Sequence, residues 1–234
     1  MLGEIEFYHR DKQRFLGTAS RRVGDNIWVR VNELILPNFT QSGAAFACDG
    51  SQRRNFGRSA FTRWVVPLDD ENCMAYAWGN FGERGDPIEW NTKEGMEMIE
   101  QGEVVDRPYA ERQASPGDVE AVEGMGAISD HEKEVFVPGD RGVGMYRNRI
   151  RKYCLDLANK GIEPPQPTEL TLDTIHTYGS DSVVYRPKPA DSRDSELLRQ
   201  TNDQVMAIIF DNDHLTGEAR DNEIIGAIEA LNQD

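Results

Sequence analysis

The sequence has 234 residues, of which 38% are hydrophobic and 29% charged, and its formal net charge is −15. This length and composition are ordinary for a globular chain with one real core, and the negative charge argues against nucleic acid as a partner. No apolar run reaches the roughly 18 residues of a membrane span, and the start, MLGEIEFYHRDK, predicts no secretory leader. The three cysteines (Cys48, Cys73 and Cys154) are widely spaced, which favours free thiols in a reducing cytoplasm.

The first third of the chain predicts antiparallel β-structure. In 27–36, apolar and polar residues alternate, as in a half-buried strand. The alternating apolar residues are Ile27, Val29 and Val31. Two more such runs, 63–68 and 73–81, flank a short polar turn at 69–72 and predict a hairpin, so this part of the chain indicates a meander.

The aromatic residues of this hairpin are Trp64, Tyr76 and Trp78. They alternate along their strands, and we therefore predict core positions for them rather than contacts to a substrate. The next segment, 82–117, is irregular and rich in glycine, proline and charge. Long loops of this kind in a compact domain tend to be functional or mobile.

Asp118 lies at the start of a segment with the composition of a helix, and it has two interpretations. Ser115 can be the N-cap with Pro116 in the first helical position, which places Asp118 in the first turn, next to free N–H groups. A carboxylate held there can equally be a metal ligand. A non-haem iron site of the facial-triad type needs one such carboxylate and two histidines. The residues alone favour the helix cap, and they leave the metal ligand open as the second interpretation.

A strong helix follows from Val143, with apolar residues recurring on one face. These residues are Val143, Tyr146, Ile150, Tyr153 and Leu157. Asp140 is the expected N-cap, Gly161 lies just past the end, and Pro164 and Pro165 block continuation. The polar face carries Arg147, Arg149, Arg151 and Lys152, and the simplest interpretation is a solvated face.

The last part predicts a strand pair within 175–189 and helices at 193–210 and 218–232. The second of these helices has one apolar face, formed by Ile224, Ile225, Ile228 and Leu231, and its acidic surroundings suggest packing on a partner chain. Strands followed by helices indicate the α+β class. An antiparallel sheet crossed by one long helix is expected to leave a cavity that suits a small apolar ligand.

Common catalytic motifs are absent from the sequence, including the glycine-rich phosphate loops and the G-x-S-x-G elbow. The four histidines (His9, His131, His176 and His214) are isolated, and no two have the spacing of a ligand pair on a helix. We therefore expect each of them to be structural or exposed, and none of them to be an iron ligand.

Four stretches, taken together and in order, resemble one protein family. They are WVRVNELILPNFTQSGA (28–44), FGRSAFTRWVVPLDDENCMAYAW (56–78), RPYAERQASPGDVEAVEGMGAI (107–128) and DRGVGMYRNRIRKYC (140–154). The family is the C-terminal catalytic domain of Rieske-type non-haem iron oxygenases, the aromatic-ring-hydroxylating α subunits of the phthalate-dioxygenase-like branch. The resemblance runs from about residue 7 to 190, and any one stretch by itself is weak.

The resemblance implies a helix-grip domain, a START-like or Bet v 1-like antiparallel sheet wrapped on a long helix, at 1–190, with a C-terminal helical extension at 191–234. In the shared P-G-D-x-E-A motif, Asp118 matches the aspartate that holds a mononuclear Fe(II), so the resemblance favours the ligand interpretation. Capping and ligation are compatible, because the two carboxylate oxygens can have different partners.

The family's other cofactor residues have no counterpart here. The Cys-x-His and Cys-x-x-His pairs of the 2Fe–2S cluster are absent, as is the stretch that carries the two iron histidines. We therefore expect a truncated oxygenase, inactive alone, whose intact form hydroxylates an aromatic or apolar molecule with O2. Its electrons would come from a reductase or ferredoxin, and the resemblance implies a homotrimer. The alternatives are a metal-free helix-grip domain that binds a hydrophobic small molecule, and one subunit of a split oxygenase.

Overall fold

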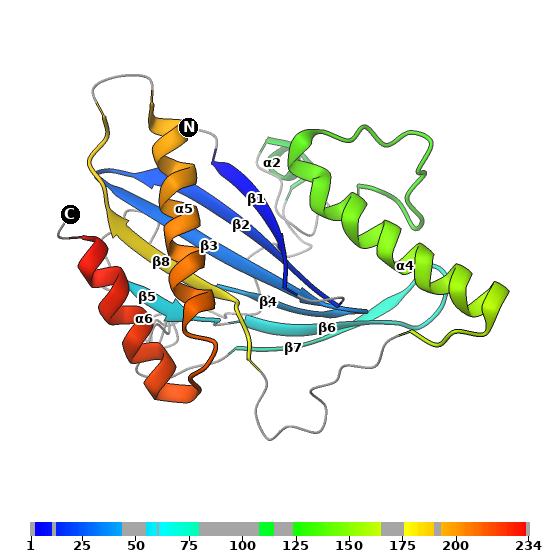
Figure 1. The fold of residues 1–234 in the computed structure, drawn as a ribbon. Helices are drawn as coiled ribbons and strands as arrows, with labels where there is room; N and C mark the ends of the chain where they lie inside the picture. The colour runs from blue at the N-terminus through cyan, green and yellow to red at the C-terminus, as the bar shows by residue number, and fades with distance from the viewer. Residues whose placement is uncertain are drawn as a thin grey trace.

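The structure is a computed structural model that describes residues 3–10, 13–43, 55–59, 61–79, 108–114, 124–164, 176–189 and 193–232. Its centre is an eight-stranded sheet in which six strands follow the order β1-β2-β3-β4-β6-β7 (Figure 1). Strand β8 pairs with β3 and β5, and every pairing in the sheet is antiparallel. The meander and the α+β class predicted from the sequence are therefore confirmed.

The strands and helices have the following bounds. The strands are β1 (Glu4–His9), β2 (Arg14–Val23), β3 (Asn26–Ile35), β4 (Phe39–Ser42), β5 (Phe56–Arg58), β6 (Phe61–Pro67), β7 (Cys73–Gly79) and β8 (Ser180–Tyr185). The helices are α2 (Tyr109–Ala114), the 3-10 turn η1 (Pro138–Asp140), α4 (Arg141–Lys160), α5 (Asp194–Asp211) and α6 (Gly217–Leu231).

Strand β1 shows how the helices are distributed over the sheet. Its residues Glu4 and Tyr8 bond to α5, through Arg199 Nε at 3.0 Å and Asp203 Oδ1 at 2.9 Å. The Phe7 ring lies under Arg141 of α4, with its centroid 5.9 Å from the guanidinium carbon. Successive side chains of a strand point to opposite faces of its sheet. Helices α5 and α6 therefore cover one face, and η1 and α4 contact the other.

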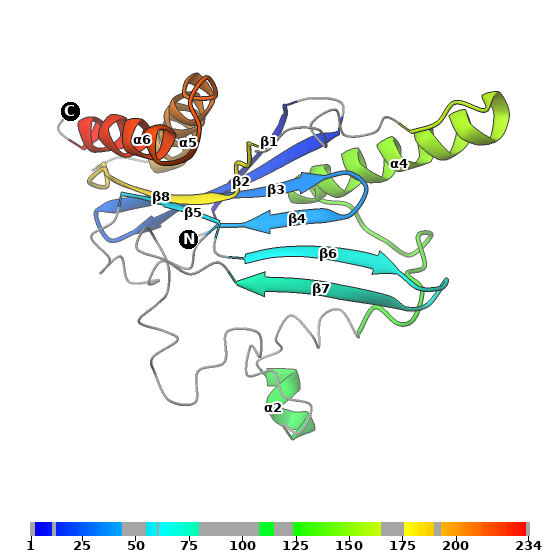
Figure 2. The same cartoon turned by 90° about the horizontal axis from the view of Figure 1, so that it is seen from below.

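Figure 2 shows the same separation along the strands, with α5 and α6 gathered near one end of the sheet and α4 near the other. This arrangement of an antiparallel sheet and long helices is consistent with a helix-grip fold. The helix that packs into the core, however, is α5. Seven of its residues are buried, whereas α4 has none.

The hydrophobic core lies between the sheet and the α5–α6 pair. Ile27, Val29 and Val31 are fully buried in it, which confirms the alternation predicted for 27–36. They meet Val205 and Ile209 of α5 in the same cluster. Fully burying an aliphatic side chain contributes about 1.5–3 kcal/mol, so this layer is a main source of stability.

The helix ends predicted from capping residues agree with the structure. Helix α4 has Asp140 as its N-cap, and it ends at Gly161, whose φ of 64° is the left-handed conformation that glycine adopts without strain. Helices α5 and α6 lie within a residue or two of the predicted ranges. The hairpin of β6 and β7 is present as predicted, with Trp64 opposite Tyr76.

Two predictions were wrong. Residues 175–189 contain one strand, β8, rather than a pair, because β8 finds its partners in β3 and β5. Tyr76 is 58% exposed and is not a core residue, because α5 and α6 cover a part of the sheet that lies away from its strand, β7. Helix α6 packs on its own chain, with Ile224 and Ile228 fully buried in the core, and a contact of the acidic tail with a partner chain stays a prediction.

Trp64 is half-buried against Phe39, with ring centroids 4.6 Å apart, and the side chain of Trp78 lies outside the described residues. Cys73 and Cys154 are free and exposed, while Cys48 lies outside the described residues. Among the described helices, none is both long and apolar enough to cross a membrane.

Candidate functional site

Asp118 lies outside the described residues, as do Ser115 and Pro116, so the choice between cap and metal ligand stays a prediction. The structure describes the chain on both sides of this segment. Helix α2 ends at Ala114, and the chain is described again from Gly124 through exposed turns into η1 and α4. The surroundings of α4 are therefore the nearest described part of the candidate site along the chain.

Helix α4 contacts the sheet through a few specific groups. The Tyr146 hydroxyl donates to the carbonyl oxygen of Pro37 at 3.2 Å, and the Arg149 guanidinium lies 5.6 Å from the ring centroid of Phe15. Cation–π contacts at partly exposed sites contribute about 0.5–1 kcal/mol. Helix α4 is thus attached to the sheet along one side, and none of its residues is buried by the described part of the chain.

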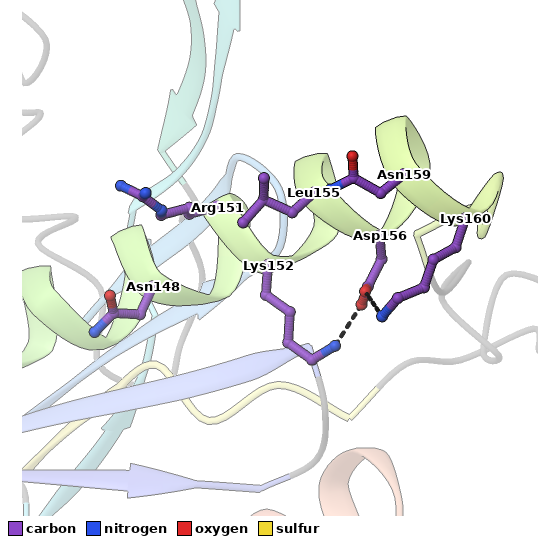
Figure 3. Close-up of a pocket in the computed structure, with 7 residues that line it drawn as sticks. All are labelled: Asn148, Arg151, Lys152, Leu155, Asp156, Asn159 and Lys160. Atoms are coloured by element: carbon purple, nitrogen blue, oxygen red, sulfur yellow. Dashed lines mark hydrogen bonds and ion pairs between the residues drawn. The ribbon is translucent and has the colours of Figure 1, made fainter.

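One pocket runs along an open side of α4 (Figure 3). Its volume is about 320 Å³, and Asn148, Arg151, Lys152, Leu155, Asp156, Asn159 and Lys160 line it. Asp156 accepts hydrogen bonds from both lysines, at 2.7 Å from Lys160 Nζ, and these bonds hold the pKa of its carboxyl below the ordinary value. Asp156 is paired with the two lysines, and the lining contains no histidine to accompany the carboxylate at an iron ion.

A second pocket of about 200 Å³ lies where the turn before η1 meets the start of α4. Glu134, Val135, Phe136, Asp140, Val143 and Arg147 line it. Arg147 binds Glu134 with both of its terminal nitrogens, and its guanidinium lies 5.6 Å from the Phe136 ring centroid. The result is a small hollow lined by three apolar and three charged residues.

A largely buried group of charges, called here the Tyr178 cluster, lies between the sheet and the α5–α6 pair, with Arg10 at its exposed edge. Its members are Arg10, Arg14, Glu33, Tyr178, Asp213 and Arg220. The Tyr178 hydroxyl donates to Asp213 Oδ2 at 2.7 Å, and the Tyr178 N–H donates to Glu33 Oε2 at 2.8 Å. Burial raises the pKa of Tyr178, with the Asp213 carboxylate as a second cause.

The Tyr178 cluster joins β2, β3, α6 and the loop after α5 into one network, in which each carboxylate is paired with at least one guanidinium. It therefore holds the fold together rather than offering a reactive group. Sequence reasoning missed it, although one signal was present. Glu33 follows Ile27, Val29 and Val31 in the same alternation, and that register places a carboxylate on the core face.

The sheet face below α5 and α6 is closed by the hydrophobic core and by this cluster. The cavity predicted between the sheet and a long helix is therefore not found on this face among the described residues, and both pockets described above lie at α4.

The four histidines lie in four different places. His9 is on β1, His131 is in an exposed turn before η1, His176 precedes β8, and His214 follows α5. Within the described part of the chain, no three histidine, cysteine, aspartate or glutamate side chains gather as a metal site. The described residues therefore do not fit a mononuclear iron centre by themselves, and such a centre would need Asp118 together with ligands from elsewhere.

Comparison with characterised proteins gives a clear relative. The chain is 34% identical, over 216 residues, to the oxygenase subunit of the tert-butanol monooxygenase / tert-amyl alcohol desaturase of Aquincola tertiaricarbonis. The match covers 88% of this chain and 44% of the relative, so the chain spans less than half of that protein's length. No family model matches the chain. The chain is thus related to an oxygenase subunit, which supports the Rieske-type family named from the sequence motifs but not the phthalate-dioxygenase-like branch.

Proposed function

From this relationship, we propose that the chain is the catalytic-domain part of the oxygenase component of a Rieske-type non-haem iron enzyme. The observation that carries the proposal is the similarity to an oxygenase subunit over 88% of the chain. The α+β architecture, with a large antiparallel sheet and long helices, fits the same family.

We propose Asp118 as the carboxylate ligand of a mononuclear Fe(II), because it occupies the matching position of the P-G-D-x-E-A motif. When bound, the iron would supply oxygen activation. The two histidine ligands and the 2Fe–2S cluster would come from a part of the assembly that this chain does not contain. Residues 1–190 would form the catalytic domain and 191–234 its helical extension.

The substrate class that we propose is an aromatic or otherwise apolar small molecule, with O2 as co-substrate. Electrons would reach the cluster from a reductase or a ferredoxin, and the intact enzyme would be a homotrimer in the cytoplasm. The isolated chain would not turn over, because electron entry and two of the ligands are missing.

The test compares two carboxylates in the protein purified from its native host through a C-terminal tag, which retains any segment or subunit that belongs to it. Asp118→Asn removes the charge of the proposed ligand. Asp130→Asn removes the same group twelve residues further on, from an exposed turn where Asp130 pairs with Lys133. Iron content is measured by metal analysis, and the Fe(II) site by electron paramagnetic resonance of its nitric oxide adduct.

We expect the wild type and Asp130→Asn to retain the iron and the signal, and Asp118→Asn to lose both. A native preparation with no iron and no reductase-dependent consumption of O2 would contradict the proposal and support the metal-free binding domain. An iron signal that survives in Asp118→Asn would leave Asp118 as a helix-capping residue. Iron that is present only while a second chain co-purifies would identify a split oxygenase.

A further inference from the structure

The sheet has a second face, opposite the hydrophobic core, and the register of the strands identifies the side chains on it. Residues paired across antiparallel strands point to the same side of the sheet. Phe7, which lies under Arg141 of α4, pairs with Gly17 of β2. Gly17 pairs in turn with Asn32 of β3, and the Asn32 side chain is exposed. The side of the sheet that α4 contacts is therefore open at Asn32.

The same register extends this face to the hairpin of β6 and β7. Leu34 lies two residues after Asn32 and shares its side of β3. Leu34 pairs with Thr40 of β4, and Thr40 pairs with Arg63 of β6. Phe61 lies two residues before Arg63, on the same side of β6. We call this surface the open face, and its residues are Gly17, Asn32, Leu34, Thr40, Phe61 and Arg63.

Arg63 is the cation among these six residues, and two neighbours hold it in place. Its Nε donates to Thr40 Oγ1 at 2.9 Å, and its guanidinium carbon lies 5.7 Å from the ring centroid of Phe61. In the part of the chain that the structure describes, no carboxylate forms an ion pair with Arg63, whose side chain is exposed. Arg30, on the same side of β3, is by contrast paired with the buried Asp181. Arg63 is thus positioned, and its charge is available to a ligand.

The open face has the composition of a surface that binds a small molecule. Leu34 and Phe61 are apolar, whereas Asn32, Thr40 and Arg63 each present a polar group. Sites for small molecules are mostly apolar and contain a few polar groups that fix the orientation of the ligand. The opposite face is closed by the core below α5 and α6. A ligand that lies against the centre of the sheet therefore has the open face available to it.

We propose that Arg63 binds the anionic group of the substrate, which is an otherwise apolar small carboxylic acid. The planar guanidinium presents N–H groups in a fork that matches a carboxylate. The net charge of −15 repels anions at long range, so an acid needs a local cation such as Arg63 in order to bind. The apolar part of the molecule would contact Leu34 and Phe61. This inference rests on the proposed function, and it names the substrate class of that site.

The position of η1 and α4 connects the open face with the proposed iron ligand. Along the chain, the segment that contains Asp118 is followed by η1 and α4. A Cβ placed at Gly139 of η1 would lie 3.7 Å from Cδ1 of Ile5, and Arg141 of α4 lies over Phe7. Ile5 and Phe7 are on the same side of β1, so the chain reaches the open side of the sheet directly after the Asp118 segment.

The first experiment compares two arginines by the affinity of the native preparation for simple acids. Benzoate, cyclohexanecarboxylate and pivalate are the probes, benzyl alcohol is the uncharged counterpart of benzoate, and ligand-observed NMR measures each Kd. Arg63→Gln removes the charge of the open face. Arg21→Gln is the control, because Arg21 is on the same side of the sheet near the end of β2, where it stacks on Trp28 at 4.8 Å.

We expect the wild type and Arg21→Gln to bind at least one of the acids with equal affinity. Arg63→Gln should weaken that binding by about tenfold or more, because it removes a charge-assisted hydrogen bond. Benzyl alcohol should not distinguish the three proteins. Arg63→Lys, which keeps the charge without the planar fork, should give an intermediate Kd. A wild type that binds none of the acids, or an acid that binds Arg63→Gln as tightly as the wild type, would overturn the proposal.

The second experiment separates this inference from the iron chemistry on which it rests. In the native preparation, the acid that binds should change the electron paramagnetic resonance of the nitric oxide adduct in the wild type but not in Arg63→Gln. Binding of the acid through Arg63 in a preparation without iron would contradict the proposed function and support an acidic ligand for a metal-free binding domain. An iron signal that responds to benzyl alcohol and to none of the acids would retain the proposed function and overturn the acidic substrate.

Discussion

Asp213, in the loop after α5, forms an ion pair with Arg220 of α6, with 3.1 Å between Oδ1 and Nη2. Arg220 has only 9% of its side chain exposed, and it also donates to the carbonyl oxygen of Ile209 at 3.2 Å. The other Asp213 oxygen accepts from Tyr178 and Arg10. This one carboxylate therefore balances two guanidiniums where the helical pair meets the sheet.

We predict that Asp213→Asn lowers the free energy of unfolding by about 2–4 kcal/mol, because it leaves the buried Arg220 charge without its carboxylate. Asp156→Asn is the control. Its side chain is 17% exposed against 18% for Asp213, and it also pairs with two cations, Lys152 and Lys160. Those lysines are 65% and 61% exposed and remain hydrated without the carboxylate, so a much smaller effect is expected.

Urea unfolding of the two variants, followed by circular dichroism, checks this prediction. Equal destabilisation by Asp213→Asn and Asp156→Asn would show that the Tyr178 cluster does not stabilise the junction of helices and sheet. A loss confined to Asp213→Asn would establish that it does.

A second prediction concerns the pH dependence of stability at Asp181. This residue of β8 is fully buried, and its carboxylate pairs with Arg30 at 3.0 Å. Burial raises its pKa from the ordinary 3.8 to about 6, despite the opposing effect of Arg30. Between these values the folded protein holds a proton that the unfolded chain releases, so the contribution of Asp181 to stability falls as the pH rises from about 4 to about 6.

The difference in unfolding free energy between the wild type and Asp181→Asn isolates this contribution. We expect the difference to fall with rising pH, at up to about 1.4 kcal/mol per pH unit. Asp69→Asn should give the opposite slope, and at lower pH, below the ordinary pKa of 3.8, because the backbone N–H of Glu71 lowers the pKa of Asp69. A flat difference for Asp181→Asn between pH 4 and pH 6 would mean that its carboxyl titrates normally.

The parts of the fold that could be predicted from the sequence are those with local signals. Asp140 and Gly161 mark the two ends of α4 by capping preferences that depend on a few neighbouring residues. The β6–β7 hairpin is marked by its polar turn, which Asp69 closes through bonds to two backbone N–H groups. Such signals do not depend on the remainder of the chain, and here they were reliable.

The parts that were missed depend on distant partners. In β2, the core-facing positions include Arg14, Thr18 and Ser20, all buried, so the strand has no apolar alternation to detect. Arg14 is tolerated there because Glu33, nineteen residues away, lies beside it on the next strand. The apolar pattern of α4 was recognised, but a pattern gives no information about which surface covers it. For the candidate site, only the resemblance singled out Asp118, and its role stays a prediction.

The last prediction concerns the attachment of α4 to the sheet at Gly142. A Cβ at Gly142 would lie 2.8 Å from Cδ1 and 2.9 Å from Cζ of the Phe7 ring, which is too close for carbon atoms. At Gly144, two residues along the helix, the nearest atom is 3.9 Å away. Alanine is favoured over glycine inside a helix by about 0.5–1 kcal/mol, so Gly144→Ala should stabilise α4. Gly142→Ala should destabilise the protein by about 1–3 kcal/mol, because the ring or the helix must move.

The double variant Phe7→Ala/Gly142→Ala separates this clash from other causes, since without the ring the alanine has space. We expect Gly142→Ala to cost less in the Phe7→Ala background than in the wild type, a coupling that a double-mutant cycle measures directly. Hydrogen exchange should show faster opening of α4 in Gly142→Ala and slower opening in Gly144→Ala. If Gly142→Ala and Gly144→Ala stabilise α4 alike, the start of the helix does not contact the Phe7 ring.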